Sequence, residues 1–357
     1  MSETVKILAI NPGSTSTKIA VYENETEKFK INIEHSVDEL GQYKTIADQY
    51  DLRKDAVLNA LADNGFAVAD LNVIAARGGT MPPVKGGAYR INDAMVDLLK
   101  NRPVAEHASN VAALIANELG RKLDIPAYIY DAISTDELTD IARISGMPEL
   151  PRTSLSHALN MRAVARKVAA AKGREYVDLN IIVAHLGGGI SMSIHHQGKM
   201  IDIVSDDEGT FSPEVSGRVP CRPLINLCYS GKYDHQTMRK MLRGKGGLIA
   251  YLGTGSAIEV EKRIKGGDEQ AKLVYEAMAY QIAKNIGELA TVVNGKVDVI
   301  VLTGGIAYSK MLTCWVSERV KSIAPVEIVA GENELESLAL GALRVYRGEE
   351  EAQEFDI

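Results

Sequence analysis

The sequence predicts an α/β protein built from two duplicated domains. Four short apolar runs rich in Ile and Val each end in a glycine turn: "VKILAINPG", "LNVIAARGG", "LNIIVAHLGGG" and "VDVIVLTGG". Such runs are typical of buried strands in an α/β sheet. The first and third runs lead through a polar turn into a second strand, and the second and fourth each end in a GG pair. The same order in both halves predicts a duplicated domain, whose glycine turns would face one cleft.

Amphipathic segments separate the strands, as this fold requires. Residues 105–122, 157–173 and 271–293 carry apolar side chains at helical spacing, and the second segment ends on a glycine suited to a C-cap. In the third segment we expect one apolar face to meet the core, formed by Leu273, Ala277, Ile282, Ile286 and Leu289.

The domain boundary is predicted near residues 148–151, which contain two prolines. This gives an N-terminal domain of residues 1–150 and a C-terminal, nucleotide-binding domain of residues 151–339. We expect the last helix, residues 340–357, to pack back on the first domain, and its acidic end, "YRGEEEAQEFD", to fray.

Composition and charge restrict the class of protein. The 357 residues suffice for about two domains with a core each, and 46% apolar with 24% charged residues is an ordinary globular balance. A total of 40 Lys and Arg against 47 Asp and Glu gives a formal net charge of −7. This balance argues against nucleic acid or an anionic membrane as the main partner, although a few local cations could hold a small anion.

The three cysteines, Cys221, Cys228 and Cys314, form no CxxC pair. We expect reduced, buried thiols, with neither a disulfide framework nor a structural zinc. The sequence shows no signal-peptide pattern, and no apolar run approaches the roughly 20 residues that span a bilayer. These observations predict a cytoplasmic protein with no membrane segment.

The first glycine turn, residues 11–18 ("NPGSTSTK"), combines a tight bend with hydroxyl groups and a cation. Gly13 allows the backbone N–H groups to approach a ligand, the four hydroxyl residues add donors, and Lys18 is a point charge suited to phosphate. A polar hairpin turn explains the pattern equally well. A P-loop is excluded, because GxxxxGK[ST] is absent and the turn leads into a strand.

Two further turns are rich in glycine. Three consecutive glycines follow His185, and this favours close approach to a nucleotide phosphate over a tight β-turn, which would need one glycine. Gly304 and Gly305 stand between a strand and a helical stretch, which would offer backbone N–H groups to an anion or a nucleotide. The segment "LGTGSA" lacks the third glycine of a dinucleotide fingerprint, which we therefore reject.

Four single polar residues stand in apolar surroundings. Arg77 lies at a strand end, His107 at a helix start, Asp131 after the strand-like "PAYIY", and His157 after "PRTSLS". Each has the alternative interpretation of a cap or a surface residue. No HExxH motif or close His and Asp cluster indicates an intrinsic metal site, whereas nucleotide-bound Mg²⁺ needs only one or two carboxylates.

Taken together, these segments resemble a known enzyme family. The stretches "NPGSTSTK", "ARGG", "YDA", "SHALNMRAVAR", "AHLGGGIS", "VLTGGIAYSKML" and "GENELESLALGALRV" are similar to the butyrate kinases and follow in the same order over almost the whole chain. That family belongs with the acetate kinases in the sugar kinase–Hsp70–actin superfamily. The resemblance implies two ribonuclease-H-like, actin-like ATPase domains with a cleft between them. It implies ATP-dependent, Mg²⁺-assisted phosphorylation of a short-chain carboxylate to an acyl phosphate, in a homo-oligomer.

The resemblance also implies roles for residues of the first domain. The phosphate-handling turn matches at Asn11, Ser14, Ser16 and Lys18. The catalytic and substrate positions match at Arg77, Asp131 and His107, with Asp131 and Glu334 (or its neighbour Glu332) near the metal.

Other implied roles fall in the second domain. His157 matches a histidine that contacts the transferring phosphoryl group. The phosphate loop matches at His185, Gly187, Gly188 and Gly189, and the adenosine loop at Gly304, Gly305 and Ile306. A second catalytic arginine matches Arg222, with Arg218 close behind it.

The chain departs from the family pattern at several positions. Val215 stands where the family pattern has an arginine, and Ser256 and Ile258 stand where it has an aspartate and an arginine. Two other readings therefore stay open. One is a kinase that prefers acetate or propionate, and the other is a nucleotide-binding superfamily member with weak or no acyl kinase activity.

Overall fold

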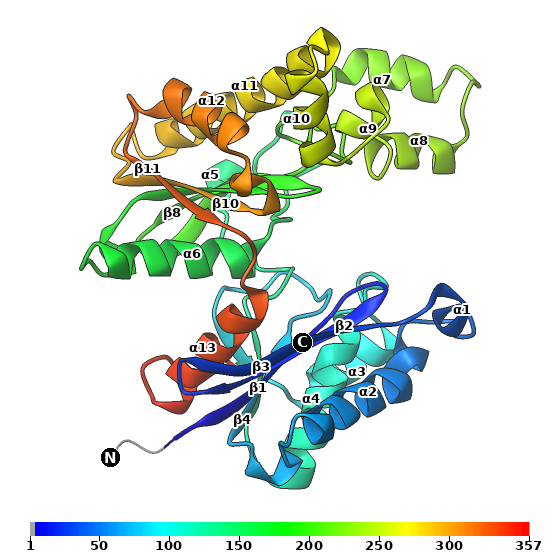
Figure 1. Cartoon of the computed structure of the whole chain (residues 1–357), viewed down its shortest axis with the longest axis vertical. Helices are drawn as coiled ribbons and strands as arrows, with labels where there is room; N and C mark the ends of the chain where they lie inside the picture. The colour runs from blue at the N-terminus through cyan, green and yellow to red at the C-terminus, as the bar shows by residue number, and fades with distance from the viewer. Residues whose placement is uncertain (1–3, 357) are drawn as a thin grey trace. The chain divides into compact units, whose positions relative to one another are not determined.

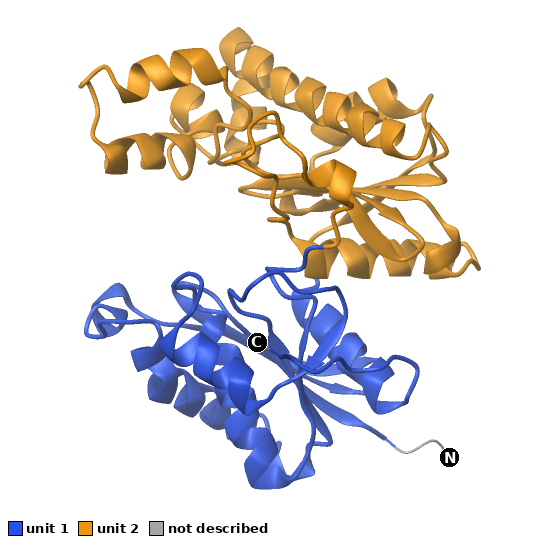
Figure 2. Cartoon of the chain, turned by 180° about the vertical axis from the view of Figure 1, so that it is seen from behind, with its two compact units in different colours: residues 1–136, 333–357 blue, residues 137–332 orange. Residues whose placement is uncertain are grey.

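The structure is a computed structural model that describes residues 4–356. The chain forms two compact units, residues 1–136 with 333–357 and residues 137–332, coloured separately in Figure 2. Each unit has its own sheet and its own hydrophobic core. The α/β prediction is therefore confirmed, and each unit is described by itself below.

Unit 1 contains a six-stranded mixed sheet in the order β3-β2-β1-β4-β6-β5. Its strands are β1 (Lys6–Pro12), β2 (Ser16–Glu23), β3 (Thr26–Glu34), β4 (Val73–Arg77), β5 (Ala88–Arg90) and β6 (Ala127–Tyr130). Its helices are α1 (Val37–Leu40), α2 (Tyr50–Asp63), α3 (Asp93–Asn101), α4 (Asn110–Leu123) and α13 (Glu334–Tyr346), with short 3₁₀ turns at η1 (Ala47–Gln49) and η2 (Val68–Asp70). Strands β1 to β3 form an antiparallel meander, and β4 and β6 continue the sheet parallel to β1.

Unit 2 contains a five-stranded sheet in the order β11-β10-β7-β8-β9. Its strands are β7 (Ile181–Leu186), β8 (Ile190–His196), β9 (Lys199–Val204), β10 (Val299–Gly304) and β11 (Val326–Ala330). Its helices are α5 (Asp140–Arg143), α6 (Ala158–Ala171), α7 (Cys221–Cys228), α8 (His235–Leu242), α9 (Gly247–Leu252), α10 (Ala257–Lys265), α11 (Glu269–Val292) and α12 (Lys310–Val320). Two 3₁₀ turns, η3 (Tyr176–Asp178) and η4 (Gly305–Tyr308), complete it.

The two sheets repeat one topology. Read from the meander edge, β3-β2-β1-β4-β6 in unit 1 corresponds to β9-β8-β7-β10-β11 in unit 2, with the same antiparallel and parallel pairings. The four glycine-terminated runs are β1, β4, β7 and β10, which occupy equivalent places. The duplication predicted from the order of turns is thus confirmed.

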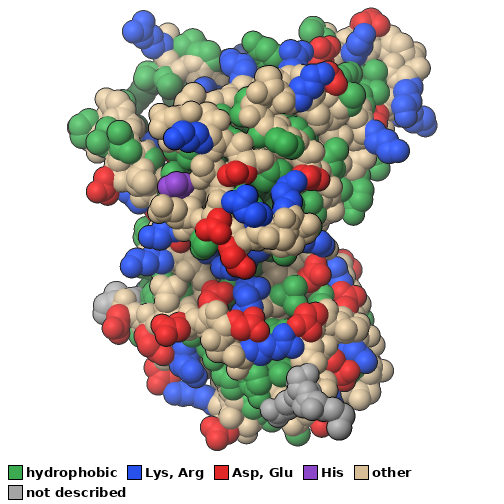
Figure 3. Space-filling view, turned by 90° about the vertical axis from the view of Figure 1, so that its left-hand side faces the viewer, with side chains coloured by type: hydrophobic (Ala, Val, Ile, Leu, Met, Phe, Trp, Pro, Cys, Tyr) green, Lys and Arg blue, Asp and Glu red, His purple; other side chains and the backbone are tan. Residues whose placement is uncertain are grey.

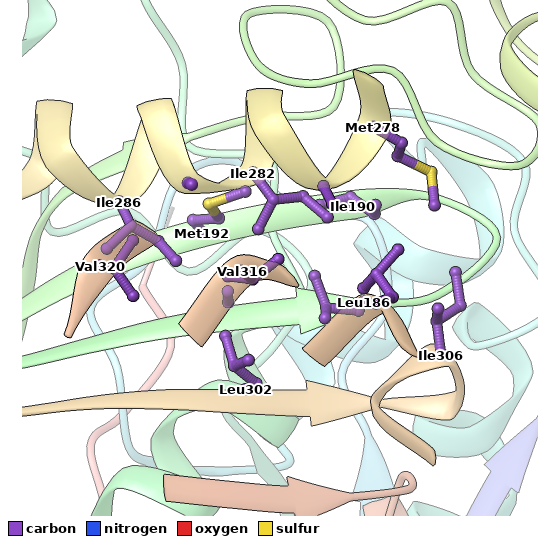
Figure 4. Packing of buried hydrophobic residues seen from close by; sticks show 14 of the residues in the cluster. Leu186, Ile190, Met192, Met278, Ile282, Ile286, Leu302, Ile306, Val316 and Val320 are labelled. Carbon is purple, nitrogen blue, oxygen red and sulfur yellow. The ribbon is translucent and has the colours of Figure 1, made fainter. Parts of the chain in front are cut away.

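Strand alternation places helices on both faces of each sheet. In unit 1, Leu8, Ile10 and Ile19 join a core cluster with α2, α3 and α4, while α13 packs on β1 and β4 from the other side (Figure 1). In unit 2, the residues of Figure 4 show β7, β8 and β10 side chains packed against α11 and α12. The opposite face of that sheet meets α6. Each fully buried Ile or Leu in such a core contributes roughly 1.5–3 kcal/mol.

The predicted helices are confirmed as α4, α6 and α11, with one error in the buried face of α11. Leu273 is 64% exposed, and the face that meets the core runs instead through Tyr275, Met278, Ile282 and Ile286. Leu273 lies two residues before Tyr275, roughly 200° around the helix, so it cannot share that face.

The unit boundaries differ from those predicted from the sequence. Residues 137–150 belong to unit 2 and residues 333–339 to unit 1. Thr139 N donates to Ile201 O (3.1 Å) in unit 2, which ties the first segment there. Leu335 and Leu338, near the start of α13, are buried in unit 1.

Two smaller expectations are wrong. The acidic tail does not fray, because Gln353 N bonds to Ala88 O (2.8 Å) and Phe355 is buried in the core of unit 1. The three cysteines are free, but they are exposed and not buried. Cys221 and Cys228 lie on α7, a helix with no buried residue.

The described part of the chain contains no helix that is long and apolar enough to cross a membrane. On the face shown in Figure 3, acidic and basic side chains are interspersed with hydrophobic and other polar ones. The excess of negative charge is therefore not gathered into one patch on that face.

A buried histidine in the sheet of unit 2 predicts a specific pH dependence of stability. His195 on β8 lies between Tyr176 Oη (2.6 Å from Nδ1) and Ser193 Oγ (2.7 Å from Nε2). Burial, with the charges of Arg162 and Arg166, lowers the pKa of His195 to about 3. The unfolded chain binds a proton at this residue below pH about 6.5, whereas the folded chain does not, so stability falls as pH decreases from there.

We expect His195 alone to cost about 2 kcal/mol of unfolding free energy between pH 7 and pH 5. Urea unfolding of wild type and H195Q at pH 5, 6 and 7 measures this, because the glutamine variant should lose that part of the pH dependence. H196Q, next to it in the sequence, should retain it. Parallel curves for wild type and H195Q would contradict the assignment.

Candidate active site

The carboxyl ends of β1 and β4 in unit 1 bring three predicted residues together. Asn11 is the penultimate residue of β1, Arg77 is the last residue of β4, and the two strands are parallel neighbours. Glu334, the first residue of α13, accepts a hydrogen bond from Asn11 Nδ2 (2.5 Å) and forms an ion pair with Arg77 Nη1. Lys18, on β2, lies directly opposite Asn11 of β1 in the antiparallel pair. The hairpin and the last helix, more than 300 residues apart, thus build one polar cluster.

Glu334 carries its negative charge into this cluster. Burial alone would raise its pKa, but the charge and hydrogen bond of Arg77, the amide of Asn11 and the charge of Lys18 together hold the pKa below its ordinary value. Arg77 is itself 9% exposed, and its buried Nε has no hydrogen-bond partner among residues 4–356. An unpartnered buried guanidinium N–H is a donor that a carboxylate or phosphoryl oxygen could satisfy.

The turn between β1 and β2 is closed by Gly13 N, which donates to Ser16 O (2.8 Å). The side chains after it differ in burial. Thr17 is fully buried, whereas Lys18 is exposed. Ser14 is exposed at the tip of the turn and Ser16 is buried beside it.

Asp131 follows β6 in a strained backbone conformation. Its φ is 41°, in the left-handed region that few residues other than glycine adopt. Its Oδ1 accepts from Gly87 N (2.8 Å) and its own N–H donates to Gly87 O (3.1 Å). The side chain is 2% exposed, so the loop at Gly87 fixes this carboxylate.

The GG turn after Arg77 serves close packing within unit 1. A Cβ on Gly78 would lie 2.5 Å from Ala132, and one on Gly79 would lie 2.4 Å from Asn110 Oδ1. That same Oδ1 accepts from Thr80 N (2.8 Å), and Thr80 Oγ1 bonds to Ala105 O. The turn is thereby joined to the segment before α4.

His107 stands on that segment, with its Nδ1 2.7 Å from Ser109 Oγ. The hydrogen bonds of Thr80 connect this segment to the strand end that carries Arg77. His107 itself is exposed.

In unit 2, a hydrogen-bond chain sets the tautomer of His185. Thr303 Oγ1 donates to Gly331 O (3.2 Å), so it accepts from Asn160 Nδ2 (3.3 Å), and the same amide donates to His185 Nδ1 (2.9 Å). The proton of a neutral His185 therefore sits on Nε2. That nitrogen lies 3.1 Å from Glu332 Oε1, outside hydrogen-bond alignment, and the ring is 1% exposed.

His157 stacks on His185. Their ring centroids are 3.9 Å apart and the ring planes differ by 8°. His157 Nδ1 lies 2.9 Å from Ser191 Oγ on β8. The two histidines, 28 positions apart, are therefore held as a parallel pair at the end of β7.

The loop Gly187–Gly189 lies against this pair. A Cβ on Gly187 would be 3.2 Å from His185 Nε2, and one on Gly188 would be 3.1 Å from Glu214 Oε1. Ser212 Oγ and Glu214 N both donate to Gly188 O (2.6 Å and 3.1 Å). Glycine is needed at both positions because a side chain would crowd His185 or Glu214, and the phosphate contact of this loop stays a prediction.

Gly304, at the end of β10, packs against the end of β7, next to the loop Gly187–Gly189. Its φ is +88°, and a Cβ would lie 2.4 Å from Leu186 O. It exchanges backbone hydrogen bonds with Gly331 (3.0 Å and 3.2 Å). Gly305 meets nothing within 4 Å and starts η4, whose Ile306 is buried in the core.

The assignment of Arg222 or Arg218 as the second catalytic arginine stays a prediction. Arg222 is exposed on α7, and Arg218 is 55% exposed and bonds to Glu288 and to Glu208 O. A further arginine that the sequence did not indicate as a candidate is Arg243, whose Nη2 lies 3.2 Å from Asp206 Oδ2. A Cβ on Gly189 would lie 3.7 Å from that oxygen.

The departures from the family pattern take different places in unit 2. Val215 is buried, forms a backbone bridge with Arg243, and lines a cavity of about 1010 Å³ that Leu155 and Asp206 also line. Ser256 caps α10 by accepting from Glu259 N (3.3 Å), and Ile258 is 85% exposed. Val215 is therefore the departure that changes the lining of a cavity.

Within residues 4–356, no group of three or more His, Cys, Asp or Glu side chains gathers to hold a metal ion. Asp131 and Glu334 are each single carboxylates fixed by hydrogen bonds. Such carboxylates fit a Mg²⁺ that brings most of its oxygen ligands with a nucleotide.

Comparison with known proteins identifies the family. The chain is 49% identical over 352 residues to "Butyrate kinase 2" of Clostridium acetobutylicum, covering 98% of this chain and 99% of that protein. The chain belongs to the acetokinase family. The family's own model matches residues 152–324. The predicted family resemblance is thus confirmed.

Solved structures support the fold of this acetokinase. An acetate kinase of Porphyromonas gingivalis matches with a TM-score of 0.81 at 18% identity, over 96% of this chain and all of that chain. A propionate kinase of Francisella tularensis matches with a TM-score of 0.72 at 18% identity, over 94% and 98%. Both likenesses show the fold alone, and they agree with two duplicated actin-like domains.

Several residues of this acetokinase site were missed from the sequence. His185 is oriented by Asn160 and Thr303, and His157 by Ser191. In the sequence, each of these three looks like an ordinary residue of a helix or strand. Asn160 offered one signal, because it follows His157 by three positions on a helix and so shares its face. Thr303 and Ser191 offered none, since only the sheet register brings them close.

Proposed function

We propose that this acetokinase transfers the γ-phosphoryl group of ATP directly to butyrate or a similar short-chain carboxylate, giving ADP and an acyl phosphate. The observation that carries the proposal is the 49% identity with a butyrate kinase over 98% of the chain. The arrangement of donors in each unit supports it.

Phosphoryl transfer to a carboxylate requires that negative charge be compensated, and it needs no general base. A short-chain carboxylate with a pKa of about 4–5 is already ionised at pH 7. Two anions must instead be brought together, and the in-line transfer must be stabilised by cations and hydrogen-bond donors. The cluster of unit 1 offers the free Nε of Arg77 and the cation of Lys18.

In unit 2, His185 offers Nε2–H beside the glycine loop, and the chain through Asn160 and Thr303 keeps it in that tautomer. Backbone N–H groups at Gly187–Gly189 can approach phosphate oxygens without side-chain obstruction. The loop at Gly304 and Gly305 would take the nucleoside. A Mg²⁺ bound with the nucleotide, held through Asp131 and Glu334, would neutralise phosphate charge.

A panel of linear acids from two to six carbons tests the proposal. Purified protein with ATP, Mg²⁺ and hydroxylamine should trap acyl hydroxamate, fastest with four- or five-carbon acids. One methylene changes discrimination by only about 1–3 kcal/mol, so neighbouring lengths should react as well. Fastest turnover of acetate or propionate would favour the alternative substrate. ATP binding without product from any acid would favour a nucleotide-binding protein.

The proposal extends to the cell and the assembly. We propose a cytoplasmic enzyme that acts on soluble small molecules, without nucleic acid or membrane partners, as a dimer or larger homo-oligomer. Sedimentation at several concentrations measures the assembly, and a monomer throughout would contradict it.

A further inference from the structure

Beneath the turn of residues 11–18 lies an arginine that no role described above uses. Arg53 on α2 is fully buried, and it is among the largest side chains with no exposed surface in the chain. Within residues 4–356 its hydrogen bonds all go to neutral groups and none to a carboxylate, and burial lowers the pKa of Arg53. A buried cation of this kind is costly unless something repays its desolvation.

All contacts of the Arg53 guanidinium are with neutral oxygens, and most belong to the turn. Nη1 donates to Ser16 O (2.8 Å) and Thr17 Oγ1 (3.1 Å), and Nη2 donates to Ser14 O (3.2 Å). Nε and Nη2 both donate to Gln49 Oε1 (3.1 Å and 3.0 Å). The planar fork therefore binds two turn carbonyls and one turn hydroxyl at once, which an ammonium group could not match.

The place of Arg53 in α2 is also electrostatically unfavourable for a positive charge. Arg53 is the fourth residue of α2, which begins at Tyr50, and a positive charge is unfavourable in the first turn of a helix. His35 shares Thr17 Oγ1 from the other side (2.8 Å). Burial, followed by the charge of Arg53, lowers the pKa of His35, so this neighbour adds no second positive charge, and the Glu39 carboxylate lies 3.7 Å from His35 Nδ1 and makes no ion pair with Arg53.

We propose that Arg53 is a positioning residue for phosphoryl binding: it fixes the turn of residues 11–18 from behind and supplies a buried positive charge that a bound phosphoryl group compensates. The inference rests on the proposed function, because it takes this turn as the phosphate contact. Arg53 holds the carbonyls of Ser14 and Ser16, and the side chain of Ser14 stays exposed at the tip of the turn. The cation lies one peptide layer behind, in a medium of low dielectric where its attraction for an anion is strong.

The test compares R53M, which removes the charge, with R53K, which keeps the charge but loses the fork. In the full-length protein we expect R53M to raise KM for butyryl phosphate and Kd for MgATP about 10- to 100-fold, and R53K to give an intermediate increase. The matched control is K54M, because Lys54 is the next residue on α2 but already pairs with Asp51 (2.8 Å) and Glu118 (3.7 Å). It also loses one positive charge, yet we expect its KM and Kd to stay within about twofold of wild type.

Each outcome decides the proposal. Folded R53M with wild-type KM and Kd would overturn it, and so would an equal loss in K54M. If R53M does not fold, R53K decides, because an unchanged KM in R53K would show that the fork is not needed. If wild type forms no acyl phosphate, the proposed function fails, but the comparison of MgATP Kd between wild type and R53M still tests Arg53.

Discussion

Replacing Asp131 by asparagine is expected to lower turnover by about 10²–10³-fold while leaving the protein folded. Asparagine keeps the Oδ1 acceptor for Gly87 N (2.8 Å), and it tolerates the left-handed φ of 41° at least as well as aspartate. The change removes the negative charge and replaces one carboxylate oxygen by an amide NH2 group. A residue that merely shapes the loop would survive this substitution, whereas one that places a metal-bound phosphate would not.

The chain offers a matched control for this substitution. Asp124 ends α4, also in unit 1 and also with a left-handed φ, of 56°. D124N should therefore show the backbone effect of the same exchange without loss of activity. Steady-state kinetics with thermal unfolding of both variants makes the comparison. Near-normal turnover in D131N would remove Asp131 from the mechanism.

The elements of the fold could be predicted because local patterns determine them. The apolar runs that became β1, β4, β7 and β10 are buried on both faces, so hydrophobicity alone marks them. Their repeated order, with a hairpin after the first run of each half, was sufficient to predict the duplication. The amphipathic helices followed from their spacing, although the exact face of α11 did not, because small shifts in phase move a whole face.

The site could be predicted only where one short segment carries the signal. The turn of residues 11–18 and the loop Gly187–Gly189 are such segments. The partners Asn160 and Thr303 and the support from Arg53 depend on which elements the sheet register and helix packing bring together. Arg53 is the clearest case, because an arginine in "DLRKDAV" reads as an exposed helix residue. Only the structure shows that it is fully buried.

The ion pair of Arg77 and Glu334 is expected to give the largest combined effect on stability and activity. R77M leaves a mostly buried carboxylate without its cation, which we expect to cost about 2–3 kcal/mol of unfolding free energy at pH 7. Turnover should fall about 10²–10³-fold, because Arg77 Nε is the buried donor that we assign to the reacting anions. Urea unfolding and kinetics on the same preparation measure both effects.

The double variant R77M/E334Q separates the two effects. A neutral pair of similar size removes the uncompensated charge, so most of the lost stability should return, whereas turnover should stay low. If turnover returned together with stability, Arg77 would act only by holding Glu334 in place.

The pH dependence of the single variant follows from the same charges. In wild type the pKa of Glu334 is held low, so its contribution to stability is present above its ordinary value of 4.5 and is lost as pH falls through the lower folded value. Without Arg77, burial dominates and the pKa of Glu334 rises, so the folded variant takes up a proton at higher pH than the unfolded chain does. The stability deficit of R77M relative to wild type should therefore be largest at neutral pH and shrink as pH falls towards about 5. A deficit independent of pH would mean that R77M loses packing and not charge compensation, and the assignment of Glu334 as an ionised partner would fail.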